Sequence, residues 1–195
     1  STNASVPARR PPSSFRPIRN SASAAPMIRT LISLLATLVL WSVVGEINHV
    51  LAPLQVYLFV GGLGVTAAAL VLPLRAGLAA SFLGGLVFDS ATPVTFGTHA
   101  LIFAAAHAVV FHLRDRLPRD DTTGRVVIAL LANLAIFLVF SFIQISRSPA
   151  PAAAWPRLLV DLVASQVFLA LVCPWFFALQ QRGLLLARVE PQRLL

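Results

Sequence analysis

The sequence predicts an all-α integral membrane protein, a bundle of six transmembrane helices with both termini in the cytoplasm. Of its 195 residues, 57% are hydrophobic and only 11% are charged, whereas soluble domains carry about 25% charged residues. The apolar residues form long uninterrupted runs, as membrane helices do. They do not alternate with polar residues, as the strands of an outer-membrane barrel would.

The net charge of +8 is the balance of fifteen arginines and seven acidic residues, with no lysine in the chain. In a membrane protein such charge gathers on the cytoplasmic side and sets the orientation, so we expect no nucleic-acid partner. Cys173 is the only cysteine, which excludes an intrachain disulfide and a multi-cysteine metal site. The chain contains no G-x-S-x-G or H-E-x-x-H motif. We expect no enzymatic activity, metal or cofactor.

Residues 1–26 differ in composition from the rest of the chain, because they are rich in serine, alanine, proline and arginine and contain no acid. Such a segment cannot bury enough apolar surface to fold, so we predict that it is disordered. Two other interpretations stay open. The segment resembles an organellar transit peptide, although its five prolines argue against an amphipathic helix. Alternatively Met27, the only methionine, is the biological start. In each case we predict that the six-helix membrane domain covers residues 27–195.

Six hydrophobic segments follow, and each predicts one membrane helix. They cover residues 30–46, 53–74, 76–89, 97–113, 126–146 and 156–179. Pro53 and Pro156 stand in the first turn of their predicted helices, where proline is tolerated best. Pro174 lies inside the sixth segment and is expected to kink it.

Arginine placement predicts the orientation of the bundle. Thirteen arginines fall on one side under the six-helix assignment: Arg9, Arg10, Arg16, Arg19, Arg29, Arg75, Arg114, Arg116, Arg119, Arg125, Arg182, Arg188 and Arg193. Only Arg147 and Arg157 fall on the other side. The rich side is the cytoplasmic one by the positive-inside rule. Four of these residues, Arg114, Arg116, Arg119 and Arg125, form a basic loop that either meets anionic lipid or a cytosolic partner or serves only as a topology signal.

The third and fourth segments are too short to span a membrane cleanly. From Arg75 to Asp89 a helix rises roughly 21 Å, and residues 97–113 reach only about 25 Å, against a hydrocarbon core about 30 Å thick. The polar stretch between them, residues 89–98, is therefore expected to dip into the outer part of the membrane. Irregular backbone is tolerated there only where protein covers it or a wet cavity meets it.

Several polar residues share the outer half of the predicted bundle. The candidate structural or partner-binding cluster consists of Asp89, Thr92, Thr95, Gly97 and His99, with Glu46 and Asp161 from the first and sixth helices. Ionisable residues within a membrane are costly and often mark function. The alternative is that these groups are hydrated and cap helix ends. His99 and His107 lie roughly 12 Å apart along one helix and cannot share a metal ion.

The glycines of the second and third segments predict close helix packing. Gly62, Gly64 and Ala67 match the dinucleotide-binding pattern G-x-G-x-x-A, but that motif needs a βαβ unit, and here it lies inside a membrane segment. Small residues let membrane helices approach closely, so we assign packing roles to Gly61, Gly64 and Gly85. On the fifth segment, one face with Asn133 and Gln144 is expected to form interhelical hydrogen bonds.

The stretch LGGLVFDSATPVTFGTHALIFAAAHAVVFHLRDRL resembles the central signature of the MreD family of bacterial rod shape-determining membrane proteins. In that family a glycine-containing helix ends in aspartate, a short polar turn follows, and a glycine leads into the next helix and a basic cytoplasmic loop. The matching positions are Gly85, Asp89, Pro93, Gly97, Arg114 and Arg116. The sixth segment, with LVASQVFLALVCPWFFAL, is similar to the family's closing helix. The arginine-rich N-terminal tail departs from the family pattern.

The resemblance implies a non-enzymatic scaffold in the bacterial cytoplasmic membrane. Proteins of this family associate with MreC, and through it with the actin-like MreB, a SEDS glycosyltransferase and a class B penicillin-binding protein of cell-wall synthesis. The alternative is the substrate-binding S component of an energy-coupling-factor vitamin transporter, also a small six-helix membrane protein with an outward-opening cavity. An intramembrane hydrolase is disfavoured, because no nucleophile–base pair is evident.

Overall fold

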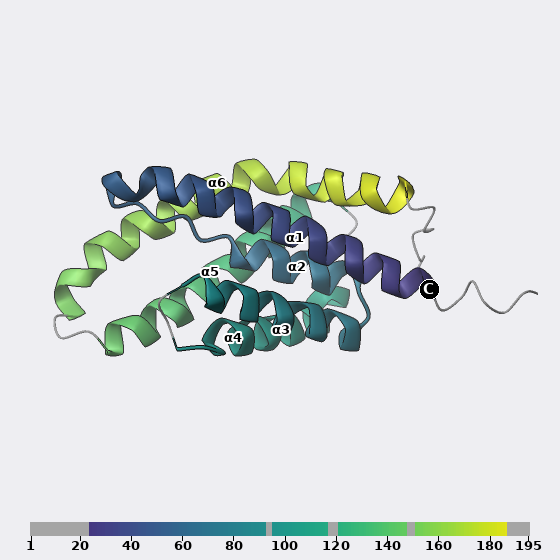
Figure 1. The fold of residues 1–195 in the computed structure, drawn as a ribbon, viewed down its shortest axis with the longest axis horizontal. Coiled ribbons are helices and arrows are strands. Elements are labelled where there is room, and N and C mark those ends of the chain that lie inside the picture. Colours follow the sequence, from purple (N-terminus) through teal and green to yellow (C-terminus); the bar gives the residue numbers. More distant parts are fainter. Residues whose placement is uncertain (1–23, 93–94, 117–120, 148–150, 187–195) are drawn as a thin grey trace, which may run out of the picture.

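The computed structural model describes residues 24–92, 95–116, 121–147 and 151–186. Within these ranges the protein is all-helical and has no β-strand, which confirms the predicted class for the described part of the chain. Figure 1 shows the arrangement of the elements. They are α1 (Ala24–Leu51), η1 (Ala52–Leu54), α2 (Gly61–Val71), α3 (Leu74–Ser90), α4 (Thr98–Leu113), η2 (Arg114–Arg116), α5 (Thr122–Ser146) and α6 (Pro151–Leu186).

Three helical stretches are long and apolar enough to cross a membrane, and they cover Met27–Leu54, Thr122–Ser146 and Ala152–Leu186. Each of them leaves large apolar side chains exposed along its length, among them Val39, Leu131 and Leu171. Water-soluble proteins rarely expose contiguous apolar surface on this scale. The three helices therefore identify a membrane protein.

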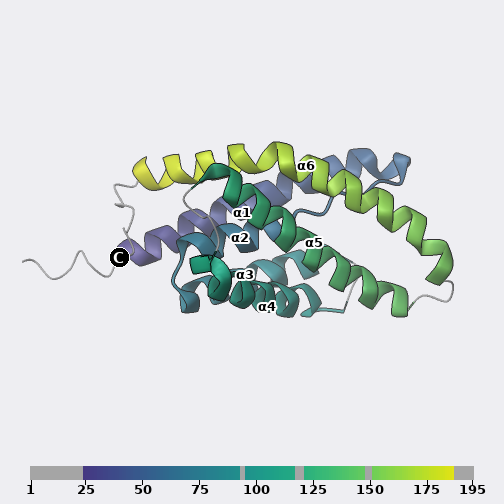
Figure 2. The same cartoon turned by 180° about the vertical axis from the view of Figure 1, so that it is seen from behind.

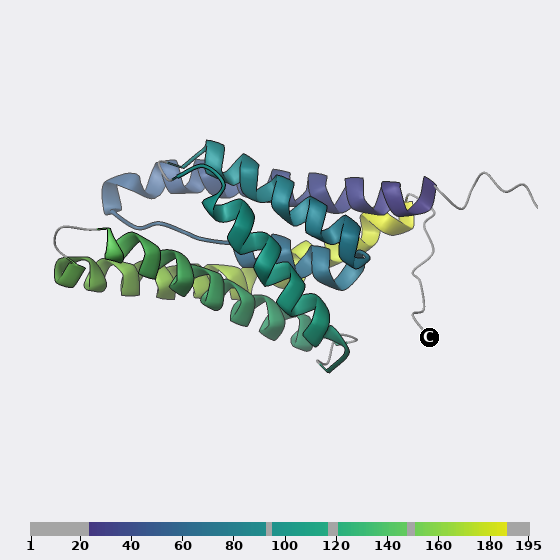
Figure 3. The same ribbon diagram turned by 90° about the horizontal axis from the view of Figure 1, so that it is seen from below.

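The second segment is only partly helical, so the prediction of one helix over residues 53–74 is wrong. Pro53 lies in the 3₁₀ turn η1, and Gln55 then adopts a left-handed conformation with φ 55°. Residues 56–60 form no helix, and α2 begins only at Gly61. Figure 3 shows the non-helical stretch as an extended connection that runs back into the bundle. Its sequence, VYLFV, consists mostly of β-branched and aromatic residues, which favour extended backbone.

The two parts of this segment together are long enough to cross a bilayer. Residues 56–59 reach roughly 13 Å when extended, and the eleven residues of α2 add roughly 16 Å, about 30 Å in all. The hydrocarbon core is about 30 Å thick. An extended half and a helical half are therefore geometrically equivalent to one full membrane helix.

The ends of the outer helices also differ from the prediction. α1 begins at Ala24, so the last three residues of the segment expected to be disordered belong to the helix, and residues 1–23 lie outside the described residues. α6 begins at Pro151, which places Pro156 beyond the first turn. Pro174 lies within the same continuous helix. Figure 1 shows α6 bending along its length, as a helix with internal prolines does.

α2 lies at the centre of the bundle. All its residues from Gly61 to Ala69 are buried, and glycines and alanines keep its surface narrow enough for other helices to approach. Figure 2 shows α5 crossing one side of the molecule diagonally, between α6 and α4. α1 and α6 close another side (Figure 1). The packing around α2 depends on its small residues, and several glycines have no room for a side chain.

α3 and α4 form an antiparallel hairpin beside this centre. They contain 17 and 16 residues, close to the short lengths expected from the sequence. The turn between them stops short of the ends of α1, α5 and α6 at the same end of the bundle (Figure 3). This position fits the expected dip of the polar stretch below the membrane surface.

Gly85 controls the distance between α3 and α4. A Cβ atom added at Gly85 would lie 2.6 Å from the backbone nitrogen of Ala100, a contact that no side-chain rotation can relieve. We expect Gly85→Ala to separate the two helices and to lower the free energy of unfolding by about 1–3 kcal/mol, the usual cost of overpacking. Thermal unfolding in detergent, followed by circular dichroism, measures this loss.

Gly183 in α6 provides the matched control for this substitution. The nearest atom to a Cβ added there is the Cγ2 methyl of the Ile32 side chain, at 3.3 Å, and no described backbone of another helix lies within 4 Å of it. Gly183→Ala is expected to change stability by less than about 0.5 kcal/mol. Equal losses from both variants would contradict the view that close backbone contact at Gly85 holds the hairpin together.

Candidate functional site

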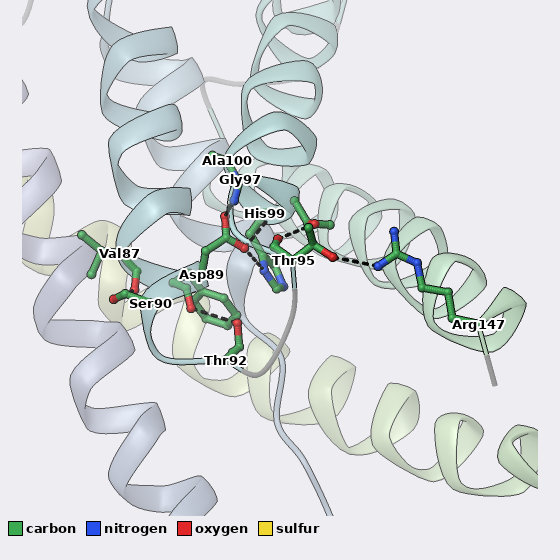
Figure 4. Close-up of polar contacts among 11 residues, drawn as sticks. Val87, Asp89, Ser90, Thr92, Thr95, Gly97, His99, Ala100 and Arg147 are labelled. Carbon is green, nitrogen blue, oxygen red and sulfur yellow. Dashed lines mark hydrogen bonds and ion pairs between the residues drawn. The ribbon is translucent and has the colours of Figure 1, made fainter. Parts of the chain in front are cut away.

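Asp89 caps the N-terminus of α4 from the last turn of α3. Its side chain is buried, with 3% of the residue exposed. The carboxylate accepts hydrogen bonds from the backbone N–H groups of Gly97 (2.9 Å), His99 (3.0 Å) and Ala100 (3.3 Å). A helix leaves its first N–H groups without partners in its own backbone, and an acidic side chain is well suited to bind them. Figure 4 shows these contacts.

Gly97 allows the chain to turn into this cap. It adopts φ 93°, a conformation that residues with a side chain rarely adopt. It precedes α4 directly, so that its own N–H and those of the first helical turn converge on one carboxylate. The short segment between Asp89 and Gly97 therefore lets a carboxylate at the end of α3 cap the start of α4.

The side chain of His99 also binds the Asp89 carboxylate. Its Nδ1 lies 2.8 Å from Asp89 Oδ1, and because an ionised carboxylate only accepts, Nδ1 donates this bond. The ring is packed against Phe88 and Phe140, with centroid distances of 4.7 and 4.5 Å. Nε2 has no hydrogen-bond partner among the described residues. No hydroxyl or thiol in that part of the chain therefore completes a nucleophile–base pair with this imidazole.

The threonines of the turn bind locally or to α5. Thr92 Oγ1 donates to the carbonyl oxygen of Phe88, and Thr98 Oγ1 donates to that of Thr95. Arg147, which follows α5, donates from a guanidinium nitrogen to Thr95 Oγ1 at 2.8 Å. Figure 4 shows this arginine reaching across to the α3–α4 turn. The turn is thus tied to the C-terminal end of α5 by a surface contact.

Asp161 binds backbone at a different place. Its Oδ1 accepts a hydrogen bond from the backbone N–H of Tyr57 at 2.8 Å. One turn later on α6, Ser165 Oγ accepts from the N–H of Phe59 at 2.8 Å. Both side chains are buried. They supply hydrogen-bond partners that the non-helical stretch, residues 56–60, lacks within its own backbone.

Two asparagines also form hydrogen bonds with the backbone of this non-helical stretch. Asn48 of α1 accepts from the N–H of Leu58 at 2.7 Å and donates to its carbonyl oxygen at 2.9 Å, as a neighbouring strand would. Asn133 of α5 accepts from the N–H of Gly62 and donates to the carbonyl oxygen of Phe59, both at 3.0 Å. The partners of Asn133 are thus backbone groups of the stretch and of the first turn of α2, rather than side chains of another helix. Nothing in the sequence around Ser165 signals that it acts in a similar way.

The predicted cluster of seven polar residues is not one site. Asp89, Gly97 and His99 come together, and Thr92 and Thr95 lie in the adjoining turn. Asp161 belongs to the separate group that binds residues 56–60. Glu46 lies on the exposed face of α1 and has no polar partner within the described ranges.

Aromatic side chains fill the centre of the bundle between these two polar groups. Phe59 lies at the middle of this aromatic cluster, with ring centroids within 6.5 Å of those of Phe88, Phe103, Phe137 and Phe140. Trp41 joins from α1, 5.4 Å from Phe88 and 5.6 Å from Phe103. Gly61 borders this group, because a Cβ added there would meet the rings of Phe103 and Phe59.

The best-defined cavity in the described part of the chain has a volume of about 10 Å³. It lies between α1, α2 and α3, and its lining includes Thr37, Trp41, Gly64 and Ser81. A space of this size holds about one water molecule, whereas sites for small organic ligands measure about 300–1,000 Å³. A Cβ added at Gly64 would meet Thr37 at 2.5 Å, which agrees with its predicted packing role.

One arginine of the predicted basic loop, Arg114, packs against the helical bundle. The guanidinium of Arg114 lies over the ring of Phe111 at 3.8 Å and donates to the carbonyl oxygen of Ala69, near the end of α2, at 3.4 Å. Arg116 is exposed and Arg125 is half-buried. Arg119 lies outside the described residues. Arg114 therefore stabilises the C-terminal end of α2, which a topology signal alone would not require.

Among the described residues no group of three histidine, cysteine, aspartate or glutamate side chains could hold a metal ion. Comparison of the chain with protein-family models, with curated proteins and with solved structures finds no match.

Proposed function

We propose that this protein is a non-enzymatic membrane scaffold of the bacterial cell-elongation machinery, of the kind found in the MreD family. The observation that carries the proposal is the packing among the described residues: aromatic rings occupy the centre of the bundle, and the best-defined cavity there has a volume of only about 10 Å³. The buried polar side chains Asp89, Asn133 and Asp161 bind backbone of the same chain. A protein built in this way acts through its outer surfaces.

The resemblance of residues 83–117 to the MreD signature supplies the biological setting. It implies a place in the bacterial cytoplasmic membrane and an MreC-like partner. Through that partner the scaffold would connect MreB with a SEDS glycosyltransferase and a class B penicillin-binding protein. The Asp89 cap, at the position of the family's aspartate, would keep the outer turn in one shape for such contacts.

The proposed topology has six spans, with α2 and the preceding extended stretch forming the second. The start of α1, the α2–α3 connection, the end of α4 and the end of α6 lie at one end of the bundle (Figure 3). The arginines near these points are Arg29, Arg75, Arg114, Arg116, Arg125 and Arg182. This distribution supports a cytoplasmic position for that end.

Cysteine labelling tests the topology. In a Cys173→Ser background, single cysteines at Thr92 and Thr122 are placed at opposite ends of the bundle. An impermeant thiol reagent applied to intact spheroplasts is expected to label the cysteine at Thr92 and to leave the one at Thr122 unlabelled until the membrane is permeabilised. The reverse pattern would invert the proposed orientation.

Purification of the tagged protein in mild detergent tests the function. An MreC-like protein and cell-wall synthases are expected to copurify, and coexpression of the MreC-like protein is expected to raise the melting temperature, since a partner that binds only the folded state stabilises it. The matched measurement adds water-soluble vitamins, for which no shift is expected. Copurification of a transporter ATPase module, or a vitamin shift of several degrees, would instead support the S-component alternative.

A further inference from the structure

The outer half of α1 presents polar and small residues on an exposed face of the bundle. Ser42, Gly45, Glu46 and His49 are all exposed, and their spacing of three or four residues places them on one side of the helix. A Cβ atom added at Gly45 would have nothing within 4 Å. No described residue packs against Gly45, and we call the face formed by these four side chains the outer α1 face.

The inner half of the same helix is different. Its exposed residues are large apolar side chains, among them Leu31, Leu35 and Val39, with 55%, 52% and 60% of their surface exposed. Such a surface is stable against lipid tails without any partner. The exposed ionisable side chains of α1 therefore lie on the outer α1 face.

Glu46 belongs to the stretch Met27–Leu54, which is long and apolar enough to cross a membrane. It follows Arg29 by seventeen residues, roughly 25 Å along the axis, inside a hydrocarbon core about 30 Å thick. No described residue forms a hydrogen bond or ion pair with Glu46 or His49. Ionisable side chains in a membrane nearly always face protein or a water-filled cavity, so a carboxylate on an outward helix face requires a cover.

We propose that the outer α1 face binds the same face of a second copy of this chain in a parallel, two-fold symmetric pair. The face is self-complementary, because it carries one acceptor, the Glu46 carboxylate, and one donor, the His49 imidazole. In an isologous contact Glu46 of one copy meets His49 of the other, and the reciprocal pair forms at the same time. Within one helix, Glu46 and His49 are three residues apart, which is about 4.5 Å along the axis and less than one helical turn.

Gly45 lies beside the acceptor position and allows the helix backbones to approach, as small residues do in other membrane dimers. Ser42, one turn deeper, adds a hydroxyl to the contact. A heterologous helix would need its own matching cation at the same depth, whereas a second copy supplies both partners. The pairing does not depend on the proposed scaffold function, since it requires only the position of the face in a membrane helix.

Disulfide crosslinking in native membranes tests the contact. Single cysteines at Ser42 and Gly45, in the Cys173→Ser background, are expected to give a dimer band on mild oxidation. Cysteines at Leu131 of α5 and Val167 of α6, which are equally exposed at 57%, serve as controls and are expected to stay monomeric. Equal crosslinking at all four positions, or a crosslink only to a protein of another size, would overturn the proposal.

Energy transfer between labelled copies in lipid vesicles then measures the pairing strength as lipid is added. Glu46→Ala and His49→Ala are each expected to raise the apparent dimer Kd at least tenfold, while the melting temperature of the diluted protein stays the same because both residues are exposed. The exchange of both, Glu46→His with His49→Glu, is expected to restore pairing. An exchange variant as weak as the single variants would rule out the reciprocal Glu46–His49 contact.

Discussion

Asn133→Leu is expected to cause the largest loss of stability among substitutions of the buried polar residues. Asn133 is fully buried, and its side chain binds the N–H of Gly62 and the carbonyl oxygen of Phe59. Leucine has a similar size but leaves both backbone groups without a partner. Each buried unsatisfied group costs about 1–3 kcal/mol, so the free energy of unfolding should fall by about 2–6 kcal/mol.

Thermal or denaturant unfolding in detergent, followed by circular dichroism, measures this loss. Gln144→Leu is the matched control, because Gln144 lies on the same helix and is exposed. Its substitution is expected to change stability by less than about 0.5 kcal/mol. If Asn133→Leu were as stable as the control, the extended stretch and α2 would not depend on this side chain.

Asp89→Ala is expected to have the next largest effect. It removes an acceptor from three backbone N–H groups and from His99 Nδ1, all in a buried place. Removing one partner of a buried charged contact costs about 3–5 kcal/mol. Asp89→Asn should cost less, about 2 kcal/mol, because one oxygen still accepts while the amide nitrogen meets N–H groups that it cannot bind.

Asp115 provides the control for the carboxylate. It lies in η2 with 72% of its side chain exposed and its carboxylate 3.8 Å from Arg114 Nε. Ion pairs with an exposed partner contribute about 0–1 kcal/mol, so Asp115→Ala is expected to stay within about 1 kcal/mol of the wild type. The measurement is again the unfolding free energy in detergent. Wild-type stability in Asp89→Ala would mean that the cap on α4 contributes nothing and that the turn is held by other contacts.

Most of the helices can be predicted from the sequence because each is bounded by charge, proline or glycine. The lengths of α3 and α4 and the role of the Asp89–Gly97 spacing as a break between helices can be read from residue type alone. Gly85 can be assigned to packing because small residues in membrane helices have few other uses.

The second segment cannot be predicted in the same way. A short apolar run has the same appearance whether it becomes a buried helix or a buried extended stretch. The deciding contacts come from Asn133, Asp161 and Ser165, which lie far along the chain and whose spacing in the sequence does not reveal a common target. Similarly, Glu46 and Asp89 are both acids near the C-terminal ends of their helices, but only the fold shows that one is exposed and the other is buried.

The extended stretch at residues 56–60 also constrains the order in which this chain enters the bilayer during synthesis. Most of its side-chain partners are made late: Asp161 follows Tyr57 by 104 residues, and Ser165 follows Phe59 by 106. Until then, its peptide groups would cost several kcal/mol each in hydrocarbon. If residues 56–71 form the second of the six proposed spans, they are therefore not expected to lie in lipid alone while the ribosome completes α5 and α6. We expect this segment to enter the hydrocarbon only after α6 has been made.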